Sequence, residues 1–373
     1  MNTHKFIKLF KSQIYFKIPT KKTILIFDKT GSENFTKVIP KNSYYILCTR
    51  AERLNIFIFL KMISKFKFSH KSYINEYIKK IEPKVIITWI DNNISFYKFK
   101  FDKTIKIAVQ NARRTFLPDD LFYNLKKDKD LNCDYIFTHN HPIKNFYKKS
   151  IKSNYIVSGS FKSNEIKIND NIKKFDLVYV STFRKSENYY MYKKYDWFSW
   201  LGKEIKLLKF AEKYCKKNNK ILTVIGAIPE IDEELKFYKK NLEINFNFIK
   251  YNKNRNVYKI IDQSKVVFGI DSTLLSECIA RNAKVGFFSF RGNFFPYNSR
   301  KFGWPYNYPL RGDFWDYRES YLQFERVIDY LYRVKKSTWK KVCKKYVKNI
   351  MVYSFKNKIL KNTLYEILKK NNF

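Results

Sequence analysis

The chain has 373 residues, which is too long for one ordinary core and favours two domains. Hydrophobic residues make up 45% of it and aromatic residues 19%, so a large packed interior is available, yet no stretch approaches the ~20 apolar residues of a membrane-spanning helix. The net charge of +42 indicates either a polyanionic partner or the bias of an AT-rich genome, which spreads lysine along the whole chain.

The five cysteines lie far apart in the sequence, which indicates separate buried thiols in a reducing compartment. The first 22 residues contain no long apolar core and no small-residue cleavage site, so we do not expect a signal peptide. The expected location is the cytoplasm, or the periphery of the inner membrane.

Apolar runs rich in β-branched and aromatic residues alternate with amphipathic segments in the first part of the chain. Strands are predicted at 23–27, 44–48, 84–89, 104–109, 134–138 and 154–157, with helices at 54–66 and 71–81 among them. Strands that alternate with helices indicate a parallel sheet covered on both faces. The polar stretch 161–174 breaks this rhythm and is predicted to be a linker between domains.

A second α/β series follows the linker. Strands are predicted at 176–180, 221–225 and 246–250, and helices from about Asp196 to Lys216 and at 257–264. The stretch 266–288 then reads as a buried strand, a polar turn, an amphipathic helix and another buried strand, and the chain ends in basic helices. We therefore expect Rossmann-like domains at 1–165 and 175–320 that face a cleft, with helices at 321–373 packing back across them.

The polar turn Asp271, Ser272 and Thr273 falls where a strand gives way to a helix N-terminus, a place that suits phosphate or carboxylate. Thr273 and Glu277 are four residues apart and share a helix face. The hydroxyls are thus expected to hold a phosphate or diphosphate, and the carboxylate a ribose diol. Ordinary helix capping is the alternative explanation of these residues.

Three carboxylates follow predicted strands of the first domain: Asp28 and Glu33 after the first strand, and Asp91 after strand 84–89. An inverting sugar transfer needs a general base beside the acceptor hydroxyl, so these are the candidate bases. An ordinary polar turn accounts for Asp28 and Glu33 equally well.

Amides and arginines follow strand 104–109, namely Gln110, Asn111, Arg113 and Arg114. Arginine grips carboxylate or phosphate with two parallel hydrogen bonds, so this turn is a candidate substrate site, with an exposed loop as the alternative. His141 follows the next strand. We expect it to contact phosphate or to transfer a proton, and we expect no metal there because no acidic residue or cysteine completes a ligand pattern.

Further candidates follow strands of the second domain. Ser181, Arg184 and Gly226 are expected to line the cleft and to help bind the donor, and Arg291 to contact substrate. Aromatic residues at 302–305 and 311–315 suit stacking on a base or sugar, or packing of an irregular loop.

Both ends of the chain interleave lysine with apolar residues. Phe6, Phe10 and Ile14 would share one helical face, and Trp339, Cys343 and Val347 another. Such helices either lie on an anionic lipid surface or dock on the core with a solvated lysine face.

The chain resembles the bacterial surface carbohydrate biosynthesis proteins of capsule and O-antigen clusters, a family of GT-B glycosyltransferases. The likeness rests on the order of segments 27–33, 49–55, 109–111, 159–161, 180–184 and 302–305, with 271–273 and Glu277. Ala112 and Asn282 stand where the family pattern has glycine. A looser likeness to Kdo and sialic acid transferases, carried by His141-Pro142 and Ser272-Thr273, implies a CMP-activated sugar.

The resemblance implies a nucleotide-sugar donor held by the second domain, a surface polysaccharide or lipid-linked glycan acceptor at the first, and an inverting transfer without metal or cofactor. Two alternatives stay open. A nucleotide-sugar epimerase shares the architecture, and a non-catalytic polyanion-binding protein would explain the charge, although the sequence has no nucleic-acid motif and we expect no nucleic-acid partner.

Overall fold

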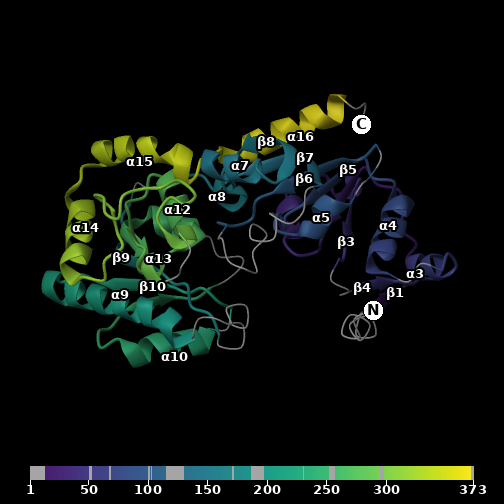
Figure 1. The fold of residues 1–373 in the computed structure, drawn as a ribbon. Helices are drawn as coiled ribbons and strands as arrows, with labels where there is room; N and C mark the ends of the chain where they lie inside the picture. Colours follow the sequence, from purple (N-terminus) through teal and green to yellow (C-terminus); the bar gives the residue numbers. More distant parts are fainter. Residues whose placement is uncertain are drawn as a thin grey trace.

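The computed structural model describes residues 13–49, 53–66, 69–99, 101, 103–114, 130–169, 172–185, 197–229, 231–251, 257–294 and 298–370. Two parallel six-stranded sheets organise them, the first built from strands between residues 24 and 157 and the second from strands between 175 and 316 (Figure 1). This arrangement confirms the expected α/β class.

The first sheet has the strand order β3-β2-β5-β6-β7-β8, and every neighbouring pair is parallel. Its strands are β2 (Ile24–Phe27), β3 (Tyr44–Leu47), β5 (Val85–Thr88), β6 (Ile105–Val109), β7 (Leu131–Thr138) and β8 (Ile151–Val157). Strands β2 and β5 are buried along their whole length, as expected for a sheet covered on both faces. Strands β7 and β8 each begin three residues before the predicted start, and their pairing shifts register between Asn132 and Tyr135.

Short helices connect these strands, and most begin at a side-chain cap. They are α2 (Ser32–Phe35), α3 (Ile56–Ile63), α4 (His70–Ile81), α5 (Ile94–Lys98), α7 (His141–Tyr147) and α8 (Phe161–Glu165). Asn55 explains why α3 starts two residues later than predicted, because its side chain accepts a hydrogen bond from the Ile58 N–H. Helix α8 begins the stretch 161–174, which connects β8 of the first sheet to the second sheet, so the first five residues of the predicted linker are helical.

A small two-stranded parallel sheet, β1 (Gln13–Tyr15) with β4 (Arg53–Asn55), lies beside the first sheet. The prediction that Ile14 lies on a helix is therefore wrong. Ile14 pairs with Leu54, and this tertiary pairing overrides the local helical pattern. Phe6 and Phe10, its predicted partners, lie outside the described residues.

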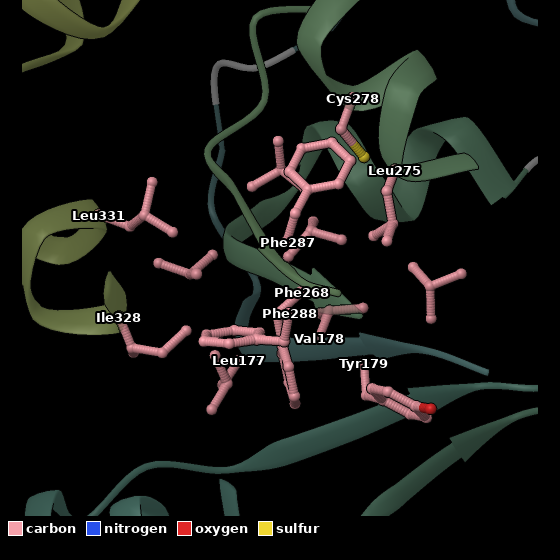
Figure 2. Close-up of a cluster of buried hydrophobic side chains, with 14 of the residues drawn as sticks. Leu177, Val178, Tyr179, Phe268, Leu275, Cys278, Phe287, Phe288, Ile328 and Leu331 are labelled. Atoms are coloured by element: carbon pink, nitrogen blue, oxygen red, sulfur yellow. The ribbon is translucent and has the colours of Figure 1, made fainter. Parts of the chain in front are cut away.

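The second sheet has the order β11-β10-β9-β12-β13-β14, again parallel throughout. Its strands are β9 (Phe175–Val180), β10 (Leu222–Ile225), β11 (Asn247–Ile249), β12 (Ser264–Gly269), β13 (Val285–Phe288) and β14 (Trp315–Asp316). Its helices are α9 (Trp197–Asn218), α10 (Ile231–Asn241), α11 (Val257–Asp262), α12 (Thr273–Ala280) and α13 (Phe290–Phe294). Figure 2 shows the core of this half, where Phe268 and Phe288 lie between strand β9 and helix α14 (Tyr321–Arg333).

The last helices bind the two halves together. Trp339 and Cys343 of α15 (Lys336–Ile350) are buried in the core of the second half, which confirms the core-docked alternative for this helix. Helix α16 (Lys358–Lys370) instead buries Leu360 and Leu364 in the core of the first half. The chain therefore crosses back to its first sheet after residue 350 (Figure 1).

Two further findings concern whole-chain predictions. The five cysteines are free thiols, and all but Cys48 are buried. None of the described helices combines the length and the apolar character needed to cross a bilayer.

Candidate active site

The carboxyl-end edges of the two sheets meet each other. In a parallel sheet all strands end at one edge, and this is where open α/β folds bind ligands. The backbone N–H of Arg113, just after β6, donates to the Thr273 hydroxyl at the start of α12 over 3.0 Å. Ser160, after β8, donates its hydroxyl proton to Glu277 of α12. The predicted polar turns of both halves therefore lie at one junction.

Asp271 is the centre of this junction in the second half. It follows β12 and its carboxylate is almost fully buried. One oxygen accepts a hydrogen bond from Arg291 at 3.0 Å and the other from Arg300 at 3.1 Å. Burial alone would raise the pKa of Asp271, but the charges of Arg291, Arg300 and Arg113 outweigh it and hold that pKa below its usual value. Asp271 is thus an ionised anchor for arginines.

Arg291 is completely buried and all its bonds stay within the protein. Besides Asp271 it donates to the Thr182 hydroxyl at 2.7 Å and to the Glu204 carboxylate at 2.9 Å. Its guanidinium lies 3.6 Å from the ring centroid of Trp200, a close cation–π contact. The predicted direct contact of Arg291 with substrate would require several of these bonds to break, so the structure places Arg291 as the organiser of this cluster.

Arg113 reaches the same cluster from the first half. Its guanidinium donates to the Ser299 carbonyl at 3.0 Å and also to the Lys301 carbonyl. Burial, helped by the charge of nearby Arg300 and opposed by that of Asp271, lowers the pKa of Arg113 to about 10. Three guanidinium groups thus gather around Asp271, and one of them, that of Arg291, also pairs with Glu204.

Helix α12 begins at this cluster. Ser272 is its N-cap, since the serine hydroxyl accepts from the Leu274 N–H at 3.3 Å, so the capping explanation of Ser272 is confirmed. Ser272 and Thr273 are both only partly buried. The helix dipole adds to the positive potential of the arginines at this point.

Glu277 lies one turn further along α12, and both of its oxygens are used inside the protein. One oxygen accepts from Ser160 of the first half and the other from the Tyr258 hydroxyl at 3.2 Å. Burial raises the pKa of Glu277 above its usual value. The predicted ribose contact would have to replace one of these hydroxyls, and it stays a prediction.

Ser181 and Gly226 follow the neighbouring strands β9 and β10, and both lie against Glu234. The Ser181 hydroxyl donates to Glu234 at 2.5 Å, and the same carboxylate accepts from the backbone of Ala227 at 3.0 Å. A Cβ on Gly226 would lie 3.2 Å from Glu234, so this turn has little room for a larger residue. Arg184 is exposed at the rim.

In the first half, Asp91 anchors the turn that carries Arg113. Its carboxylate accepts from Arg114 Nε at 2.9 Å and from the Asn111 backbone at 3.1 Å, and it also accepts from the Tyr147 hydroxyl. Asp91 is completely buried in an ion pair with Arg114, and this pairing disfavours it as a base. Gln110, also a predicted substrate residue, is buried and instead accepts from the His139 backbone at 2.8 Å.

Asp28 and Glu33 differ in surroundings. Asp28 is buried, and its carboxylate accepts from the Thr30 N–H at 2.9 Å and the Thr49 hydroxyl at 2.8 Å. Its backbone has a φ of 99°, which is rare for a residue other than glycine and is often found at functional sites. Glu33 is exposed on the first turn of α2.

His141 lies outside this junction. It is exposed at the start of α7 and lines an open cavity of about 380 Å³ together with Phe146, Lys149, Tyr306 and Asn349. No group of three His, Cys, Asp or Glu side chains that could hold a metal is found in the described ranges.

Sequence reasoning missed three members of the arginine cluster: Arg300, Glu204 and Trp200. They lie in the 3-10 turn at 298–300 and on helix α9, and neither segment carries a motif. Only the fold brings them to Asp271.

Solved structures of other proteins share the fold at low sequence identity. The wall teichoic acid polymerase TagF is 10% identical with a TM-score of 0.57, over 100% of this chain and 94% of that one. The UDP-GlcNAc 2-epimerase of Methanocaldococcus jannaschii is 12% identical with a TM-score of 0.53, over 93% and 99%. S. aureus MnaA, solved with UDP, is 13% identical with a TM-score of 0.51, over 94% and 97%.

These likenesses confirm the GT-B-like fold class. No curated protein matches the sequence. A family model described as "putative O-antigen biosynthesis protein" matches residues 107–371, which include the Arg113 turn, α12 and the whole second sheet. The chain therefore belongs to this O-antigen biosynthesis family, as its sequence resemblance indicated.

Proposed function

We propose that this protein is a glycosyltransferase of surface glycan synthesis that acts on the cytoplasmic side of the membrane. It moves a sugar from a nucleotide-activated donor to a polysaccharide or lipid-linked acceptor, with inversion and without a metal ion. Family membership supports the setting, and the GT-B-like fold supports the reaction class.

The observation that carries the proposal is the arginine cluster at the start of α12. Arg113, Arg291 and Arg300 all act on the single carboxylate of Asp271, and the helix N-terminus adds positive potential. Arg300 is 8% exposed, and its Nε has no hydrogen-bond partner among the described residues. A donor phosphate would supply the missing acceptor and charge.

The same cluster supports a transfer that needs no metal. As the bond between the sugar and the phosphate of the donor breaks, negative charge develops on the leaving phosphate. Fixed guanidinium groups in a buried site can stabilise this charge. Ser272 and Thr273 are the residues through which we expect the phosphate to be held, because both are partly accessible. Glu277 and the Ser181 turn would then lie beside the nucleoside.

The general base is expected from the first half. Asp91 is committed to Arg114 and Tyr147, so Asp28 and Glu33 are the better candidates. Asp28 is held by Thr30 and Thr49 on an unusual backbone conformation, which favours it as a group fixed in position for a proton transfer.

The first test is a thermal-shift screen of CMP, UDP and GDP and their sugars, followed by transfer or hydrolysis assays. We expect one nucleotide to stabilise the wild type. The double substitution Ser272→Ala and Thr273→Val should remove most of that shift. Thr363→Ala, at a partly buried threonine on α16, is the matched control and should leave it unchanged. The absence of a shift and of turnover with every nucleotide sugar would contradict the proposal.

A nucleotide-sugar epimerase is the second candidate, and the fold likeness to UDP-GlcNAc 2-epimerases is what favours it. The two activities separate cleanly in one experiment. An epimerase converts the nucleotide sugar without any acceptor, whereas a transferase needs an acceptor to form its glycan product. Conversion of donor to its epimer in the absence of acceptor would decide for the epimerase.

A further inference from the structure

Large apolar side chains are exposed together at one end of the first half. In β1 and the residues after it, Ile14 is 53%, Phe16 70% and Ile18 52% exposed. On α3, Phe57 is 40% and Leu60 54% exposed. Phe66, just after α3, is 85% exposed, so we define an apolar end surface made of these six residues: Ile14, Phe16, Ile18, Phe57, Leu60 and Phe66.

Backbone pairing makes this surface continuous. Strand β1 pairs with β4, which leads directly into α3, and the Asn55 side chain that caps α3 also donates to the Lys17 carbonyl at 2.7 Å. Residues 16–18 therefore lie beside the first turn of α3, where Phe57 is exposed. Phe57 and Leu60 are three residues apart and share one helix face. In Figure 1, β1, β4 and α3 lie at the end of the molecule farthest from α14.

Helix α3 is apolar on its exposed side as well as on its buried side. Ile58 and Met62 are buried in the core of the first half, and Phe59 and Ile63 are partly buried against it. An exposed apolar face on the opposite side of such a helix adds nothing to folding and commonly marks a partner surface.

The charge around this surface identifies the partner. Among the described residues, 13–27, 53–66 and 69–75 contain seven Lys and Arg and no Asp or Glu. Lys61 and Lys65, which are next to Leu60 and Phe66 in the sequence, have exposed side chains, and both pair with the buried Glu76, at 4.0 Å and 2.8 Å. Apolar groups ringed by lysines complement a bilayer with anionic headgroups.

We propose that the apolar end surface binds an anionic lipid bilayer. Phe57, Leu60 and Phe16 enter the interface between headgroups and acyl chains, while Lys17 and Lys61 extend to the phosphates. Only the purpose of this lipid binding rests on the proposed function, because a bilayer-bound protein would have its first half close to a lipid-linked acceptor. The binding itself needs neither donor nor acceptor.

The test is co-sedimentation of the full-length protein with vesicles, in the absence of any nucleotide sugar. Vesicles of equal parts phosphatidylcholine and phosphatidylglycerol are compared with phosphatidylcholine alone. The double substitution Phe57→Ser and Leu60→Ser removes the helix part of the surface. Leu322→Ser is the matched control, because Leu322 is 71% exposed on α14 in the other half.

We expect the wild type to bind the anionic vesicles, to be released by salt, and to bind phosphatidylcholine at least tenfold more weakly. The double variant should bind at least tenfold more weakly than the wild type, and the control equally well. Unchanged binding by the double variant would overturn the proposal. So would a wild type that binds no vesicle, or a dimer in solution that the double variant abolishes, since a second copy would then occupy the surface.

These results are separable from those on the proposed function. A protein that binds vesicles but transfers no sugar would disprove only the transferase. A protein with transferase activity on soluble acceptor and no affinity for vesicles would disprove only the membrane surface.

Discussion

Replacement of Arg291 by methionine tests whether the arginine cluster holds the second half together. Methionine keeps much of the volume and the contact with Trp200 but removes the charge. Asp271 would keep Arg300 at 3.1 Å as a partner. Glu204 would keep the Tyr179 hydroxyl at 2.8 Å and the Tyr238 hydroxyl at 2.9 Å, but it would lose its cation.

The expected loss in the free energy of unfolding follows from the partners that Asp271 and Glu204 would keep. Removal of one partner of a buried ion pair costs about 3–5 kcal/mol, because the other charge stays buried. The remaining partners of Asp271 and Glu204 favour the lower end, about 3 kcal/mol. With a urea m-value of about 2 kcal/mol per molar, the unfolding midpoint should fall by about 1.5 M.

The assay is urea denaturation followed by tryptophan fluorescence, since Trp200, Trp315 and Trp339 all lie in the second half. Arg318→Met is the matched control. Arg318 pairs with Asp316 at 2.8 Å, but its side chain is 48% exposed, so its loss should cost less than about 1 kcal/mol. If Arg291→Met shifts the midpoint no more than Arg318→Met, the cluster contributes no special stability and the reasoning fails.

Two further predictions concern backbone and pH. Gly31 has a φ of 77°, and a Cβ there would lie 2.0 Å from the Trp89 ring, so Gly31→Ala should destabilise by about 2–4 kcal/mol in urea melts. Gly202→Ala in α9, where a Cβ meets nothing within 4 Å, should instead stabilise by about 0.5–1 kcal/mol, and equal effects would refute the steric argument. For Glu277, burial raises the pKa in the folded state, so its protonated form adds stability that is lost as pH rises through that pKa. The stability of the wild type relative to Glu277→Gln should therefore fall as the pH rises above the usual glutamate pKa of 4.5 in paired urea melts, and a pH-independent difference would contradict it.

Much of the fold could be predicted from local pattern. Short runs such as Ile24–Phe27 and Val85–Thr88 are apolar throughout because both faces of a parallel sheet are covered, and this pattern is readable without a structure. One element was misjudged because local pattern and tertiary pairing disagree. Ile14 fits a helical face but pairs with Leu54 in a strand.

The candidate site was only partly predictable. The turn at Asp271 could be found because a strand followed by Ser272, Thr273 and a helix is a local signature. The roles of its neighbours could not be found this way. Asp91 resembled a free carboxylate in the sequence, but Tyr147 and Arg114 reach it from other segments and occupy it.

The sequence by itself determined the alternation of strands and helices, the polar turns at strand ends and the family, because each is recorded in short stretches of neighbouring residues. Only the tertiary structure decided which turns meet. Arg113 and Thr273 are 160 residues apart and form a hydrogen bond because two sheets face each other. The charge balance at Asp271 likewise depends on side chains from three separate segments, and electrostatic energy depends on distance in space, which the order of residues does not give.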